Sequence, residues 1–199
     1  MSEPMRISPK YAVEDWKAVD FSTEEGWKKA ICIFEDRIRG RFLDLIDAIK
    51  CSTYAGFAVL ALDCLLIETL QQFRKGLPAT PQGRGEAGKF FESFLTETSF
   101  SSYFNNKELA SMFYNQIRCG ILHQGEVKEN SRVLIRKVTP LVSFTADRRG
   151  IIINRKLFHK QLVNEFEQYL SQLRDPSNSD LRSKFKKKMD HICRVTIGD

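Results

Sequence analysis

Apolar residues recur every three or four positions along much of the chain, which is the spacing of one buried face on an α-helix. The first such stretch consists of Trp27, Ile31, Phe34, Ile38, Phe42, Leu45 and Ile49. It follows the sequence Ser-Thr-Glu-Glu at 22–25, a capping-box pattern in which Ser22 is expected to cap the helix N-terminus. The pattern predicts a long helix that starts at this cap and buries one stripe of side chains.

A second predicted helix spans about 53–75 and ends at Gly76, a residue that favours helix termination. Its apolar run at 54–67 is shorter than the roughly 20 residues of a membrane span. The run also contains Asp63, so we expect a buried helix and no membrane segment. The Pro- and Gly-rich segment at 77–88 is predicted to be a loop.

A further helix is predicted after Asn105 and Glu108, which form another capping pattern. It carries an apolar ladder with a spacing of four residues, consisting of Leu109, Phe113, Ile117 and Ile121. Between about 131 and 154 the pattern changes to β-branched clusters, which predict a small antiparallel sheet of two or three strands. The helical period returns from about Arg155 until Pro176.

These elements predict a mainly α fold, an antiparallel helical bundle with a small β-hairpin or sheet inserted between two of its helices. A chain of 199 residues with 42% hydrophobic content is long enough to enclose one full core. We expect one helical domain at 22–175, an irregular N-terminal segment at 1–21 and a basic C-terminal tail at 176–199.

The charge balance, 31 Lys and Arg against 25 Asp and Glu, gives a net charge of +6 and permits a polyanionic partner without requiring one. Five cysteines without a C-x-x-C pair predict neither a disulfide framework nor a zinc cluster, and we expect no metal or other cofactor. The N-terminal sequence lacks the pattern of a secretory signal, so a cytoplasmic location is expected. The tail contributes a basic run of candidate RNA-binding residues, Lys184, Lys186, Lys187 and Lys188.

One helix carries two candidate catalytic residues, Arg118 and His123, with four residues between them. Imidazole moves protons near neutral pH, and guanidinium holds a phosphate as negative charge develops on it. The pair therefore suits cleavage of an RNA phosphodiester by its own 2′-hydroxyl. The ordinary alternative is a histidine bonded at a helix end and a salt-bridged surface arginine. The other histidines, His159 and His191, are expected to be structural or exposed.

On an ideal helix five residues turn through about 500°, so Arg118 and His123 are expected to point about 140° apart. This divergence predicts that the pair works in a cleft shared by two copies of the chain, related by a twofold axis. Gln116 and Gly120 lie on one helical edge with His123. Gly120 lowers helix stability, which fits a place where another backbone or a substrate comes close.

The sequence R-C-G-I-L-H at 118–123, late in an amphipathic helix of a mostly helical domain, resembles the R-x4-6-H signature of the HEPN superfamily. The likeness in helix order covers roughly 24–173, although only the six-residue motif is specific. The resemblance implies a helical domain that dimerises with its two motifs facing each other. In many members it also implies metal-independent RNA cleavage in toxin–antitoxin or anti-phage systems.

Carried over by position, the resemblance makes Arg118 and His123 the catalytic pair. An acidic or polar residue from an earlier helix supports the pair in many members, and here Asp63 or Glu68 could serve, with nothing in the sequence to choose between them. Family nucleases usually place a polar residue where this chain has Cys119. The other candidate supporting residues are Asn115, Gln116, Cys119 and Gly120.

The favoured function is thus a HEPN-type endoribonuclease that acts on RNA as a homodimer, with an antitoxin or regulatory protein as a candidate partner. The alternative is a non-catalytic dimeric adaptor of the same fold that binds RNA or a protein, with Cys119 marking the loss of the chemistry. A third interpretation is a scaffold whose apolar helices bind another helix. In that case, the Arg and His have only structural roles.

Overall fold

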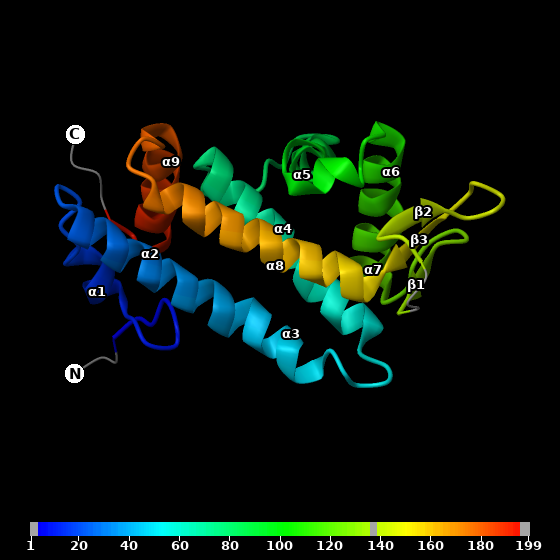
Figure 1. Ribbon diagram of the computed structural model, residues 1–199, viewed down its shortest axis with the longest axis horizontal. Helices are drawn as coiled ribbons and strands as arrows, with labels where there is room; N and C mark the ends of the chain where they lie inside the picture. The colour runs from blue at the N-terminus through cyan, green and yellow to red at the C-terminus, as the bar shows by residue number, and fades with distance from the viewer. Residues whose placement is uncertain (1–3, 136–138, 196–199) are drawn as a thin grey trace. The chain divides into compact units, whose positions relative to one another are not determined.

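The computed structural model describes residues 4–135 and 139–195 and is mainly helical, with one small sheet (Figure 1). The chain forms two compact units. The motif unit comprises Ile46–Gln71 and Thr80–Glu165, and the terminal unit comprises the described residues among Met1–Leu45, Gln72–Ala79 and Phe166–Asp199. The domain boundaries expected at 21 and 175 stay a prediction. Helices α4 (Gly56–Lys75) and α8 (Arg155–Arg174) contribute residues to both.

The first long helix, α2 (Glu24–Ile38), begins close to the predicted position. Its N-cap is Thr23, whose hydroxyl accepts a hydrogen bond from the Gly26 amide at 3.0 Å, and not Ser22. The Ser22 hydroxyl instead donates to Asp20. Ser22 and Thr23 are adjacent and either hydroxyl could cap the helix. Because Ser22 is bound to Asp20, the cap is Thr23.

A π-helical turn, η1 (Arg39–Leu43), separates α2 from α3 (Asp44–Ile49). The predicted buried stripe included Leu45, but this side chain is 50% exposed, and Leu43 and Ile46 are buried in its place. The prediction assumed a constant helical period. A π turn holds an extra residue, so it shifts the buried face along the sequence.

The terminal segments are more structured than the sequence suggested. The N-terminal segment, expected to be irregular, contains α1 (Val13–Lys17). The basic tail forms α9 (Ser179–Ile192), a helix with one buried face. Buried Trp16 in α1 donates from its indole to Asp190 at 2.8 Å and contacts the ring of Phe185. The high charge of α9 concealed an apolar stripe of Phe185 and Met189, which binds this helix into the core of the terminal unit.

Helix α4 ends where predicted, before Gly76 at a φ of 64°. Among the described residues it is the one helix whose length and composition would suit a membrane span, but half of its most apolar stretch is buried inside the structure. A single helix of this kind is weak evidence for a membrane span. The cytoplasmic location expected from the sequence stays a prediction.

In the motif unit, α5 (Glu86–Glu97) and the short 3-10 turn η2 (Ser99–Ser102) precede one continuous helical segment. This segment consists of α6 (Lys107–Met112), the π turn η3 (Phe113–Arg118) and α7 (Cys119–Gln124). Asn106, one residue after the predicted cap, accepts from the Glu108 amide at 2.7 Å. The segment ends at Gly125, whose φ of 68° suits a glycine. The motif therefore lies on the last turns of a helix, as predicted.

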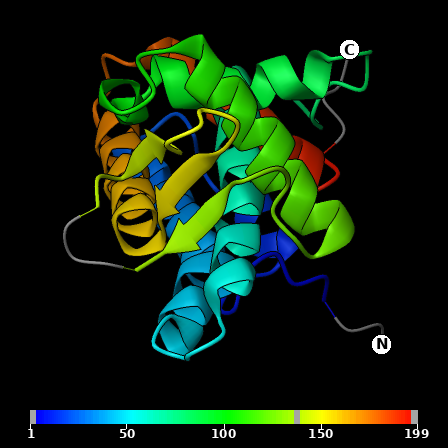
Figure 2. The ribbon, with the colours of Figure 1, turned by 90° about the vertical axis from the view of Figure 1, so that its right-hand side faces the viewer.

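The β insertion is confirmed as a three-stranded sheet of β1 (Arg132–Leu134), β2 (Val142–Phe144) and β3 (Ile151–Asn154), in the order β1-β3-β2 (Figure 2). β2 and β3 form the expected antiparallel hairpin, but β1 runs parallel to β3. The expectation of a purely antiparallel sheet was therefore wrong. The short turn between β2 and β3 requires these two strands to be antiparallel. β1 is not joined to β3 by a short turn, so the residue pattern of the sequence did not determine the direction of β1.

Candidate functional site

Arg118 and His123 are in direct contact within one chain, since Nη1 of Arg118 lies 3.2 Å from Nε2 of His123. The expectation that the two side chains diverge was wrong. The expectation assumed an ideal α-helix with side chains that point straight outward. Arg118 instead ends a π turn, and its long side chain bends toward the following turn. The geometric reason for requiring a second copy of the chain is thereby removed.

Glu68 on α4 fixes the guanidinium of Arg118. Nε and Nη2 of Arg118 each lie 2.7 Å from a carboxylate oxygen of Glu68, and the two side chains are only 15% and 13% exposed. Burial disfavours the charged form of Arg118, but the Glu68 carboxylate outweighs it and raises the pKa of Arg118 above its ordinary value. Of the two acids that the sequence left open, Glu68 is the one that contacts the motif.

The contact with Arg118 also defines the state of the His123 ring. An arginine can only donate, so Nε2 of His123 accepts and the proton of the neutral ring is assigned to Nδ1. His123 is exposed, so the ring is open to solvent. The pair thus combines an unprotonated imidazole nitrogen with a fixed cation, an arrangement that can take a proton and bind an anion.

Tyr114 is a neighbour of the pair that the sequence reasoning missed. Its ring lies under the guanidinium of Arg118, with Cζ of Arg118 5.5 Å from the ring centre. Gly88 leaves room for this ring, because a Cβ there would come within 3.1 Å of it. The position of Tyr114, four residues before Arg118 on one helix, could have revealed the contact.

The chain matches no protein-family model, no curated protein and no solved structure. The HEPN resemblance therefore depends on the motif and the helix order alone. Within 4–135 and 139–195, no three His, Cys, Asp or Glu side chains lie together as a metal site would require.

Two of the candidate supporting residues, Asn115 and Gln116, make contacts away from the pair. Asn115 donates to the Ser111 carbonyl at 2.9 Å. Gln116 accepts from the Ser131 hydroxyl at 2.6 Å and donates to the Arg149 carbonyl at 3.0 Å. Gln116 therefore connects the motif helix to the segments that flank the sheet.

Gly120 and Cys119 have different surroundings. A Cβ on Gly120 would clash with the carbonyl oxygen of Glu126, so the glycine allows the chain to fold back against its own helix. The close backbone expected at Gly120 is present, and it belongs to the same chain. The sulfur of Cys119 lies 4.0 Å from Nη1 of Arg118, which places this residue beside the pair.

The candidate RNA-binding lysines lie on α9 in the terminal unit and are mostly engaged. Lys184 pairs with Asp180 and Lys186 with Asp190, each at 2.6 Å. Lys188 is buried and donates to the Pro78 carbonyl at 2.5 Å, whereas Lys187 is exposed. The run is therefore not a continuous row of solvent-directed cations.

Asp63, the other candidate acid, is fully buried and contacts His159, whose Nδ1 lies 2.8 Å from Oδ1 of Asp63. His159 is thus a buried, partnered histidine, in line with the structural role expected of it. Burial raises the pKa of Asp63 above its ordinary value of 3.8, although His159 and Arg155 oppose this effect.

The raised pKa of Asp63 predicts a pH-dependent contribution to stability. The folded chain binds this proton more readily than the unfolded chain, so the contribution of Asp63 to the free energy of unfolding falls as pH rises above 3.8. Asp63→Asn keeps an acceptor for His159 and removes the titration. In urea unfolding between pH 4 and 7, the wild type should therefore lose stability relative to Asp63→Asn, and a constant difference would contradict this.

A companion variant, Asp63→Ala, separates the hydrogen bond from the charge. It leaves the buried Nδ1 of His159 without an acceptor, which should lower the free energy of unfolding by about 1–3 kcal/mol relative to Asp63→Asn. The same urea titration measures this difference. Equal stability of the two variants would show that the contact with His159 contributes little.

Proposed function

We propose that the chain is a HEPN-type, metal-independent endoribonuclease in which Arg118 and His123 act on an RNA phosphodiester. The 3.2 Å contact between Nη1 of Arg118 and Nε2 of His123 is the observation that carries this proposal. Glu68 supports it by holding the guanidinium in place. A proton acceptor beside an oriented cation is the minimum that this reaction needs.

In the proposed reaction, Nη1 of Arg118 turns from Nε2 of His123 to the phosphate, which frees the lone pair of Nε2. Nε2 then takes the proton of a ribose 2′-hydroxyl, and the 2′-oxygen attacks the adjacent phosphorus. The bond from phosphorus to the 5′-oxygen breaks, and that oxygen receives a proton from the imidazolium or from water. The products are a 2′,3′-cyclic phosphate and a 5′-hydroxyl. Arg118 donates from Nη1 to the non-bridging oxygens, where negative charge increases in the transition state.

We retain the homodimer in this proposal because of the HEPN resemblance, not because the two side chains need a second copy to meet. A twofold pair of chains would bring two Arg118–His123 pairs to one groove and lengthen the surface open to RNA. Single-stranded or looped RNA is the expected substrate, because its backbone is free to adopt the in-line geometry. A role in toxin–antitoxin or anti-phage defence belongs to the same proposal.

The direct test incubates the purified protein with single-stranded RNA in EDTA and identifies the new ends. The expected result is cleavage that leaves 2′,3′-cyclic phosphate and 5′-hydroxyl ends. Sedimentation measures the oligomeric state of the same sample. A dimeric preparation that leaves the RNA intact would overturn the nuclease proposal, and a monomer that cleaves would overturn the dimer only.

A second candidate function, a non-catalytic adaptor, is favoured by the engagement of Arg118. Nε and Nη2 are both bound to Glu68, so Nη1 is the amino group that remains for a phosphate. An adaptor would bind RNA without cleaving it, and binding would weaken with salt. Binding by a preparation that yields no cyclic phosphate would favour this alternative.

A further inference from the structure

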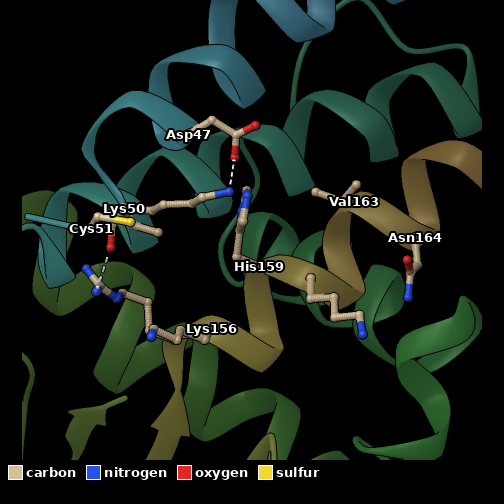
Figure 3. A pocket seen from close by; sticks show the side chains of 10 residues that line it. Asp47, Lys50, Cys51, Lys156, His159, Val163 and Asn164 are labelled. Atoms are coloured by element: carbon tan, nitrogen blue, oxygen red, sulfur yellow. Dashed lines mark hydrogen bonds and ion pairs between the residues drawn. The ribbon is translucent and has the colours of Figure 1, made fainter.

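The motif unit contains a cavity of about 490 Å³. Neither Arg118 nor His123 is among the residues that line it. Its walls come from the end of α3, the turn after it, the start of α4 and the first half of α8 (Figure 3). Its volume is within the roughly 300–1,000 Å³ of small-molecule sites. The lining residues are Asp47, Lys50, Cys51, Val59, Arg155, Lys156, His159, Lys160, Val163 and Asn164.

The cavity has a cationic lining. Four of its residues carry a positive charge and one, Asp47, is acidic and pairs with Lys50 at 2.6 Å. Lys156 and Lys160 lie one turn apart on α8 and are exposed, so both ammonium groups can turn toward a bound anion. The cavity therefore favours a ligand with more than one negative charge.

Arg155 provides a buried donor at this cavity. The residue is only 4% exposed, and its Nη2 donates to the Lys50 carbonyl at 3.1 Å. Its Nη1 is buried and has no hydrogen-bond partner among the residues that the structure describes. A buried guanidinium N–H without an acceptor is costly, and an anion in the cavity would supply one.

His159 adds a second oriented group. Its Nδ1 is bound to Asp63, so Nε2 is left for a ligand. Figure 3 shows the His159 ring and the Lys50 side chain directed to the same part of the cavity. The aliphatic side chains of Val59 and Val163 complete the lining with an apolar surface.

We infer that this cavity binds a small phosphate monoester, with the phosphate between Arg155, Lys156 and Lys160 and an apolar body against Val59 and Val163. A phosphate monoester carries nearly two charges and three acceptor oxygens, which match several separate donors, whereas a carboxylate would satisfy fewer of them. The N-terminus of α8, a helix of 20 residues, adds a favourable dipole. The inference does not depend on RNA cleavage.

Titration calorimetry of the full chain with phenyl phosphate tests this inference, because the probe joins a phosphate to an apolar ring. We expect phenyl phosphate to bind at least about tenfold more tightly than inorganic phosphate and phenol, which each offer one half of the recognition. Equal binding of phenyl phosphate and phenol would overturn the role of the cations. Equal binding of phenyl phosphate and inorganic phosphate would overturn the role of the apolar wall.

The variant Lys156→Gln/Lys160→Gln removes two exposed cations and should weaken phenyl phosphate binding by about tenfold or more. Lys107→Gln is the matched control, because Lys107 is also exposed near the start of a helix in the same unit, and it should bind as the wild type does. Arg155→Gln should abolish binding. If Arg155→Gln fails to fold, the double variant still decides the question.

A single-stranded RNA provides the last arm of the test. Should RNA bind through Lys156 and Lys160 while phenyl phosphate does not bind at all, the cavity would be part of an RNA surface and the small-molecule proposal would be overturned. Unchanged phenyl phosphate binding in the double variant would overturn it as well. Binding that is lost in the double variant and retained in Lys107→Gln supports the inference, whatever the outcome with RNA cleavage.

Discussion

His123→Ala is expected to reduce the rate of RNA cleavage by about 100-fold or more, because removal of a proton-transfer group typically has this effect. His123 is exposed, so the substitution should change the free energy of unfolding by less than about 0.5 kcal/mol. The rate is measured from the release of 2′,3′-cyclic phosphate ends in EDTA. Stability is followed in parallel by urea unfolding, which separates a loss of chemistry from a loss of fold.

His191→Ala is the matched control for this experiment. It makes the same substitution at another exposed histidine, in α9 of the terminal unit, and should leave the cleavage rate unchanged. Equal rates for His123→Ala and the wild type would show that another group, or a contaminant, performs the cleavage. A rate lowered equally in both variants would indicate a general defect of the protein.

Phe113→Ala should have the largest effect on stability, lowering the free energy of unfolding by about 3–5 kcal/mol. Phe113 is fully buried at the start of the π turn that leads to Arg118. Its ring stacks on Phe158 at 4.8 Å between ring centres and also contacts Phe91 and Phe104. Removing the ring leaves a cavity among three aromatic side chains, and urea unfolding measures the loss.

Tyr54→Ala controls for the removal of an aromatic ring as such. Tyr54 is 96% exposed, so its replacement should change stability by less than about 0.5 kcal/mol. A loss below 1 kcal/mol for Phe113→Ala would mean that neighbouring rings refill the space. The packing of the motif helix would then be less specific than the ring contacts indicate.

Long, regular elements were the part of the fold that the sequence predicted best. Glycine at 76 marked a helix end correctly, because this position adopts a left-handed backbone that other residues avoid. The helical period before Pro176 likewise identified α8. Burial of one helical face imposes this period directly, so it is readable without knowledge of tertiary contacts.

The two π turns and the partners of the charged residues were not predictable in this way. The shift of the buried face from Leu45 to Ile46 follows from one extra residue in a turn, which no local pattern announces. The choice of Glu68 over Asp63 as the partner of Arg118 depends on how α4 meets the motif helix. Tertiary packing determines which acid is the partner, and the local patterns of a sequence do not reveal that packing.

Helix α4 carries both acids, and they serve different neighbours. Asp63 holds the ring of His159, and Glu68 holds the guanidinium of Arg118. The two are about 7.5 Å apart along the helical axis, on a backbone too stiff to let one move alone. A slide or roll of this helix would therefore displace both carboxylates together, away from His159 and from Arg118.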